Sequence, residues 1–276
     1  MTHVVHQSTL QFTRAALLGL LLTAAACTLF HFTTAPVTAT QGATAQPSPT
    51  RQVYNVRVTH VKPGMAAAFR ELHQKEVLPA LKKGGVKELS FWTTATYGEG
   101  YENVTVSPSE GLKRLDEPSA LTRALGEEGA RALTTKWGQL VTDTRQFSLQ
   151  TRPELSIPPK TNDAPKLAVV YRSQIAPGRV NEYEEVFKNF TLPWLRKSEH
   201  KGFLLGRVGF GGDSNEYIGM FLLDSFTDMD KWVASFANAG SGPGAKLAGI
   251  MLHQESAVYR YVPEMSIRPE SQRAAK

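Results

Sequence analysis

The chain has 276 residues, of which 41% are hydrophobic and 20% are charged, so its composition excludes the disordered class and its length allows one large or two small domains. Its formal net charge is +6, but no run of lysine and arginine exceeds two residues, which excludes the clustered basic footprint of a nucleic-acid-binding protein. Cys27 is the single cysteine, so the chain has no internal disulfide and no site built from several thiolates.

Residues 1–45 are predicted to be an export signal. Arg14 is their only Lys, Arg, Asp or Glu, and it directly precedes an apolar run from Ala15 to Phe32. Ala43-Thr44-Ala45 has the small-x-small form that a signal peptidase accepts, which predicts a mature start near Gln46. Two alternatives stay open: the run is close to the length that spans a bilayer, and Cys27 resembles a lipoprotein acylation site. All three place the body outside the cytoplasm, in the periplasm or extracellular space, with or without a membrane tether.

An internal repeat sets the architecture of the remaining chain. Val61-Lys62-Pro63-Gly64 recurs as Ile175-Ala176-Pro177-Gly178, 114 residues later. The segment around Pro79 recurs around Pro193 at the same spacing, as do Glu102 and Glu216. Pro153-Glu154-Leu155-Ser156-Ile157 returns as Pro263-Glu264-Met265-Ser266-Ile267, at a spacing of 110. The matches keep one order, which indicates two copies of one module.

The first copy begins with a predicted strand, Val53–Val61, followed by a Pro-Gly turn that suits proline's fixed φ and glycine's freedom at φ > 0. A helix with Phe69 and Leu72 comes next, and Pro79 is expected to kink or end it. Two strands, a second helix and a short final strand complete the copy, at Leu89–Thr96, Glu102–Val106, the region of Leu121 to Leu140, and Arg145–Gln150.

The second copy has the same order. Leu167–Ile175 is its first strand, and its first helix carries Tyr183, Phe187, Phe190 and Trp194 at helical spacing, with Pro193 inside. Strands are predicted at Phe203–Phe210, Glu216–Leu223 and Ala257–Val262. The second helix is expected to have Thr227 as its N-cap and Met229, Trp232, Val233 and Phe236 on one face.

The predicted fold class is therefore α+β, with two tandem ferredoxin-like βαββαβ units. The first repeat covers residues 51–152 and the second covers residues 167–267. A proline-rich linker is expected at 153–166 and a disordered tail at 268–276.

The opening segment from Tyr54 to Gly64 resembles that of NIPSNAP-like proteins, in which a tyrosine, an arginine three residues later and a Pro-Gly turn recur. In the second copy Ala168 and Tyr171 stand where Tyr54 and Arg57 stand in the first. With the tandem layout, the chain resembles the dimeric α+β barrel superfamily, which also contains antibiotic-biosynthesis monooxygenases, haem-degrading enzymes and chlorite dismutase. The resemblance implies that the two units pair their sheets as an intramolecular pseudo-dimer, with a pocket for an apolar ligand.

Apolar residues of both opening strands fall on both parities, which is typical of strands buried on two faces and supports that pairing. The candidate ligand-binding residues are polar or aromatic groups expected near strand faces or ends: Tyr54, Arg57, His60, Trp92, Tyr101, Arg172, Tyr217 and His253. No cysteine, histidine or carboxylate spacing indicates a metal site, and no cofactor is predicted.

Three functions remain as hypotheses. The leading one is an exported NIPSNAP-like protein that binds a small apolar or aromatic ligand, and self-association into a homo-oligomer is compatible with it. The enzymatic alternative is a cofactor-independent monooxygenase. A haem-binding protein ranks third: the haem-degrading relatives imply an Asn, Trp and His set, for which Asn55 and Trp92 are present without a third member, and His253 would be the axial ligand.

Overall fold

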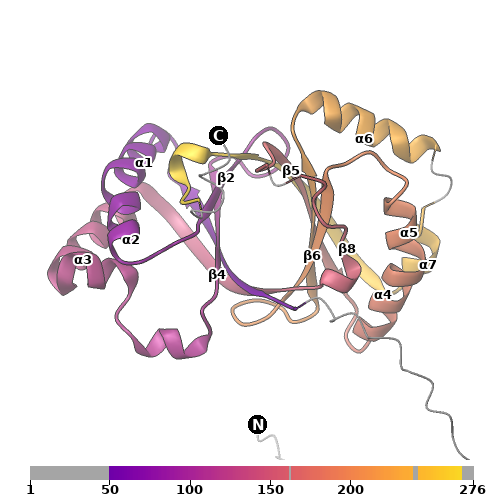
Figure 1. The fold of residues 1–276 in the computed structure, drawn as a ribbon, viewed down its shortest axis with the longest axis horizontal. Coiled ribbons are helices and arrows are strands. Elements are labelled where there is room, and N and C mark those ends of the chain that lie inside the picture. The colour runs from indigo at the N-terminus through magenta and orange to yellow at the C-terminus, as the bar shows by residue number, and fades with distance from the viewer. Residues whose placement is uncertain (1–49, 162, 239–241, 269–276) are drawn as a thin grey trace, which may run out of the picture. The chain divides into compact units, whose positions relative to one another are not determined.

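The computed structural model describes residues 50–161, 163–238 and 242–268, which belong to one compact unit (Figure 1). The predicted leader, Cys27 and the tail beyond Arg268 lie outside the described residues. Within the described ranges, none of the helices combines the length and hydrophobicity that a membrane crossing requires.

Eight antiparallel strands close into a barrel, in the order β1-β3-β2-β8-β5-β7-β6-β4. The bounds are β1 Val53–Val61, β2 Ser90–Thr94, β3 Glu102–Pro108, β4 Val141–Thr151, β5 Leu167–Ile175, β6 Gly202–Val208, β7 Glu216–Leu223 and β8 Met251–Tyr261. The first four strands are contiguous in the barrel, as are the last four. Two short seams join the halves. In one, β2 pairs with β8, beginning where Trp92 lies opposite Tyr261. In the other, β4 pairs with β6, beginning where Leu149 lies opposite Val208.

The helices cover the outside of the barrel, those of the first half on one side and those of the second half on the other (Figure 1). The bounds are α1 Ala66–Leu72, α2 Leu78–Lys83, α3 Ala120–Leu140, α4 Val180–Val186, α5 Leu192–Leu195, α6 Phe226–Asn238 and α7 Gly244–Leu247. The aromatic side chains of Phe203 and Phe221 pack against Phe187 and Trp232, so the second half buries the larger of the two helix-facing cores.

The Pro-Gly turns agree with the sequence prediction, because Gly64 and Gly178 have φ of 82° and 79°. Of the two outcomes expected at Pro79 and Pro193, a kink or an end of the helix, the end is wrong. A π-helical turn precedes each proline, at His73–Val77 and Phe187–Thr191, and the helix then continues with the proline in its first turn. The wider π-helical turn keeps the backbone hydrogen bonded next to the proline, which supplies no N–H, so the helix continues past it.

Three further predictions need correction. The N-cap of α6 is Ser225 instead of Thr227, since the Ser225 Oγ accepts the backbone N–H of Asp228 at 3.1 Å. Val233 is exposed, whereas Trp232 is buried, so the apolar face of α6 is narrower than predicted. The final strands are long, because β4 and β8 each have 11 residues.

The repeated Pro-Glu-x-Ser-Ile segments are arms that each half extends into the other. Leu155, 1% exposed, lies in the helix-facing core of the second half, where Ile157 forms a bridge to Phe203. In return, Met265 packs with Phe69 in the first half, and Ile267 forms a bridge to Leu89. The start of the expected linker 153–166 is therefore a packed element.

Candidate functional site

Alternate residues of each strand point into the barrel, and at mid-height these are apolar. Val56, Phe147 and Val208, from β1, β4 and β6, form one buried cluster. Trp92 and Tyr259, from β2 and β8, contribute to another that also contains Ala168. Side chains from both halves therefore fill this part of the interior.

Polar residues replace the apolar ones at the end of the barrel where β1 ends and β3 begins. The register places Glu102 and Asp143 on either side of His60, and it places Glu216 opposite Gln174 in the second half. Further polar groups at this end include Arg145, Arg172 and Glu255, and the hydroxyl of Tyr259 donates to Glu102.

His60 is surrounded by three carboxylates. Its Nε2 lies 2.9 Å from Glu99 Oε2 and 3.1 Å from Glu102 Oε2, and its Nδ1 lies 2.9 Å from Asp143 Oδ1. Glu102 is 8% exposed, and its second oxygen accepts a hydrogen bond from the hydroxyl of Tyr259. We call these residues, with His60 at their centre, the His60 cluster.

Burial opposes protonation of His60, but the hydrogen bond to Asp143 and the charges of Asp143, Glu102 and Glu99 outweigh it, so the pKa of the imidazole is raised. Burial and the hydrogen bond to Glu102 raise the pKa of Tyr259, which keeps the phenol a proton donor. The hydrogen bond to His60 lowers the pKa of Asp143. The surroundings of His60 therefore favour its protonated form.

Two arginines neutralise the acid of the second half at the same end of the barrel, one from β5 of the second half and one from β4 of the first. Arg172 Nη2 lies 2.7 Å from Glu216 Oε1, and Arg145 Nη2 lies 3.1 Å from Glu216 Oε2. Burial alone would lower the pKa of Arg172, but its hydrogen bond to Glu216 raises it. Glu216 is thus held between two guanidinium groups, which we call the Glu216 cluster.

The structure brings together only some of the predicted site residues. His60 and Arg172 lie in the two polar clusters, and His253 stands exposed at the same end, its Nε2 3.9 Å from Glu255 Oε2. Trp92 lies inside the barrel, its ring centroid 5.2 Å from that of Tyr261. Tyr101 is exposed in the β2–β3 hairpin, with φ of 65°.

The other predicted residues lie away from the polar end. Arg57 donates to Gln146 at 3.1 Å, and Tyr54 donates to Gln52 at 2.8 Å near the start of β1. Tyr217 is fully buried on the helix side, where its hydroxyl donates to Glu184. Asn55 is on the opposite face of the sheet from Trp92, so these two do not share a site as the haem-degrading relatives implied.

Sequence reasoning missed Glu99, Glu102, Asp143, Arg145, Glu216 and Tyr259 as site residues. Spacing along the chain gave no indication of the cluster around His60, because Asp143 lies 83 residues away in the chain. One signal was available: Glu102 and Glu216 recur at the repeat spacing, at the first position of a strand. Acids kept at equivalent strand starts indicate a shared polar end.

A groove of about 1060 Å³ lies at the other end of β1, beside the β4–β6 seam. It contains three of the most exposed large apolar side chains of the described residues: Leu112 (63% exposed), Leu115 (79%) and Phe210 (73%). Its polar lining includes Arg51, Tyr54, Asn55, Gln146, Gln150, Arg152 and Arg207. We call it the seam groove.

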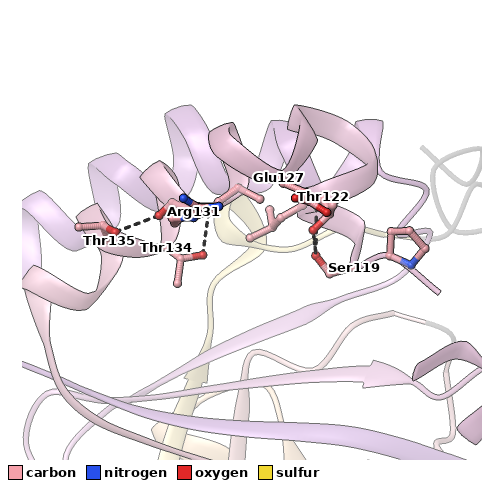
Figure 2. Close-up of a pocket in the computed structure, with 9 residues that line it drawn as sticks. Ser119, Thr122, Glu127, Arg131, Thr134 and Thr135 are labelled. Carbon is pink, nitrogen blue, oxygen red and sulfur yellow. Dashed lines mark hydrogen bonds between the residues drawn. The ribbon is translucent and has the colours of Figure 1, made fainter. Parts of the chain in front are cut away.

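Figure 2 shows a smaller hollow along α3 that we do not assign to a ligand. The hydroxyl of Thr134 donates to the carbonyl of Ala130 at 2.8 Å, and that of Thr135 donates to Arg131 at 3.0 Å. Ser119 accepts the N–H of Thr122 at 3.1 Å and caps the helix. These hydroxyl groups form hydrogen bonds within α3 and at its N-terminus.

Comparison with known proteins finds similar proteins by structure alone, since no family model and no curated protein sequence matches the chain. Two similar solved structures are named as putative monooxygenases. That from Lactobacillus acidophilus has a TM-score of 0.51 and 8% identity over 80% of this chain and 97% of its own. That from Fusobacterium nucleatum has a TM-score of 0.51 and 11% identity over 76% and 91%.

A chlorite dismutase variant from Candidatus Nitrospira defluvii is similar to the same degree, with a TM-score of 0.51 and 11% identity over 77% of this chain and 92% of its own. The chain shares with these structures an α+β fold in which helices cover a closed barrel of eight antiparallel strands. At these identities the likeness shows the fold alone, so any activity of this chain has to be argued from its own residues.

Proposed function

We propose that this chain is an exported binding protein that takes a small apolar or aromatic molecule in the seam groove. The observation that carries the proposal is the grouping of Leu112, Leu115 and Phe210, all more than half exposed, around one cavity. Exposed apolar side chains are ordinary when scattered, but a contiguous group in a concave surface is typical of a ligand site.

The polar lining supports a ligand that also carries an acceptor or an acidic group. Arg207 lines the groove and donates through Nε to the carbonyl of Ser214 at 2.6 Å, which fixes the direction of its guanidinium. Arg152 is held by Glu184 and Gln150, at 2.8 and 2.7 Å. Positioned guanidinium groups beside apolar surface suit an aromatic acid.

The proposal includes the architecture and the family. We infer that the halves are two tandem ferredoxin-like units that form an intramolecular pseudo-dimer of the NIPSNAP-like type. The repeat spacing supports this, as do the two seams and the reciprocal arms around Leu155 and Met265. Residues of both halves line the seam groove, so the proposed ligand site is formed by a single chain without a second copy. The predicted leader supports export.

Titration with the aromatic sulfonate 1-anilinonaphthalene-8-sulfonate tests the seam groove. We expect saturable fluorescence with one high-affinity site, and an affinity at least fivefold weaker in Phe210→Ser and Leu115→Ser. Leu252→Ser is the matched control, because Leu252 is 61% exposed on β8 and lies outside the groove. Equal affinity in all three variants and the wild type would contradict the proposal.

The cofactor-independent monooxygenase stays the alternative, favoured by the two structures named as putative monooxygenases that share the fold. Such an enzyme consumes oxygen as it oxidises a bound aromatic compound. Oxygen uptake with a panel of hydroquinone-like compounds would favour it if uptake is lost in Phe210→Ser and kept in Leu252→Ser.

A further inference from the structure

The His60 cluster is separate from the seam groove, and the proposed ligand binding makes no use of it. Its charges do not balance: three carboxylates surround one imidazole, and in the described part of the chain the ion pairs of Glu99, Glu102 and Asp143 are all to His60. Even with His60 protonated, the cluster keeps a net negative charge. Such a group attracts a further cation.

The donor atoms are already gathered on one side of the imidazole. One atom each from His60, Glu99 and Glu102 lies within 4.8 Å of the other two, and Nε2 is the histidine atom that faces both carboxylates. A tetrahedral Zn²⁺ holds its nitrogen and oxygen ligands about 3.4 Å apart. Glu99 is on the exposed hairpin, so its carboxylate is free to make the small shift that this requires.

A second set of residues fixes these donors in the way that metal ligands are usually fixed. The other ring nitrogen of His60 is hydrogen bonded to Asp143 at 2.9 Å, which leaves Nε2 as the unprotonated, metal-binding atom when the ring is neutral. The second oxygen of Glu102 accepts from Tyr259, which orients that carboxylate. Histidines that bind divalent metals usually use one ring nitrogen for the metal and hydrogen bond the other to a carboxylate, as His60 does with Asp143.

We infer that His60, Glu99 and Glu102 bind a divalent transition-metal ion of the Zn²⁺ type, with Asp143 and Tyr259 orienting the ligands. One imidazole and two carboxylates give a neutral site with Zn²⁺ and leave a coordination position for water or a small anion. The imidazole nitrogen favours Zn²⁺ over Mg²⁺, which prefers oxygen ligands. The site lies at the polar end of the barrel, apart from the seam groove.

Isothermal titration of the full chain with ZnCl₂, after treatment with EDTA, tests the site. We expect His60→Gln to bind one equivalent of Zn²⁺ fewer than the wild type, and Glu99→Gln to bind that equivalent at least tenfold more weakly. Because Glu99 is exposed, its variant reports on binding without a folding defect. Asp143→Asn should weaken binding roughly tenfold to hundredfold, as loss of an outer partner does.

His253→Gln is the matched control, since His253 is a second histidine at the same end and 70% of its side chain is exposed. It should bind Zn²⁺ as the wild type does, and MgCl₂ should not compete at millimolar concentration. The assignment would be overturned if His60→Gln and the wild type bound the same number of equivalents with the same affinity. It would also be overturned if His253→Gln lost binding as fully as His60→Gln. Because Phe210→Ser leaves this cluster intact, its zinc affinity separates failure of this site from failure of the seam groove.

Discussion

The two halves place equivalent acids at the same end of the barrel and neutralise them differently. His60, Glu99 and Glu102 in the first half stand where Gln174, Asp213 and Glu216 stand in the second, 114 residues later. In the second half, Gln174 donates to Asp213 at 2.9 Å, and Glu216 is held by Arg172 of the same half and Arg145 of the first half. In the first half, His60 contacts both acids, and Tyr259 of the second half donates to Glu102.

The cause of the difference lies in few residues. Val58 occupies the first-half position of Arg172, so Glu102 lacks the arginine neighbour that Glu216 has on the adjacent strand. An acid held by arginines is already satisfied, whereas acids around a titratable imidazole can exchange a proton for a metal ion. One backbone frame thus supports an internally neutralised cluster and a cluster open to a cation.

Removing the acid should cost more in the second half than in the first. Glu216→Gln leaves Arg145 and Arg172 without their shared carboxylate, and we expect a loss of about 2 to 3 kcal/mol, discounted because the arginines are 40% and 30% exposed. Glu102→Gln relieves repulsion among like charges and should cost under about 1 kcal/mol in EDTA. Urea unfolding of both variants measures this, and equal losses would remove the distinction between the clusters.

Giving the first half the arginine of the second should close its cation site. Val58→Arg places a guanidinium beside Glu102, and it should reduce Zn²⁺ affinity at least tenfold, about 1.4 kcal/mol. Val58→Met, which adds volume without charge, is the control and should keep the affinity. Zinc titration of the two variants decides the point; an unchanged affinity in Val58→Arg would show that Glu102 is not a ligand.

The smallest effect is a pH dependence confined to the first half. Because the pKa of His60 is raised in the folded chain, its contribution to stability is complete below the unfolded value of about 6.5 and is lost as pH rises through the folded pKa. In EDTA, the wild type should therefore lose up to about 1 kcal/mol relative to His60→Gln between pH 6 and pH 8. A constant difference across that range, by urea unfolding at each pH, would contradict the raised pKa.

The sequence predicted the strands whose residues are mostly apolar or β-branched. The bounds of β1, β5 and β7 agree with prediction, because each is a continuous run between turn residues. β4 and β8 were predicted too short, since their first halves, such as Thr142 to Gln146, are polar. Those residues line the polar end of the barrel, where their ladders to β1 and β5 hold them extended.

The candidate site was predictable only in part for a related reason. His60 and Arg172 could be named as strand residues, but their partners depend on register and barrel closure. Tyr259 meets Glu102 across 157 residues of sequence, and only the β2–β8 seam brings them together. Periodicity along one strand indicates which face a residue occupies, and it carries no information about the strand opposite.

The reciprocal arms constrain the order in which the molecule is completed. The first half is synthesised first, yet it depends on later residues. Strand β2 lacks its second neighbour until β8 has emerged, and the core lacks Met265 until the segment after β8 has emerged. β4 is a free edge until β6 has emerged, and β2 is one until β8 has emerged, and a free edge strand can pair with another chain. A chain that crosses a membrane from its N-terminus would therefore need protection from self-association until almost its last residues are available.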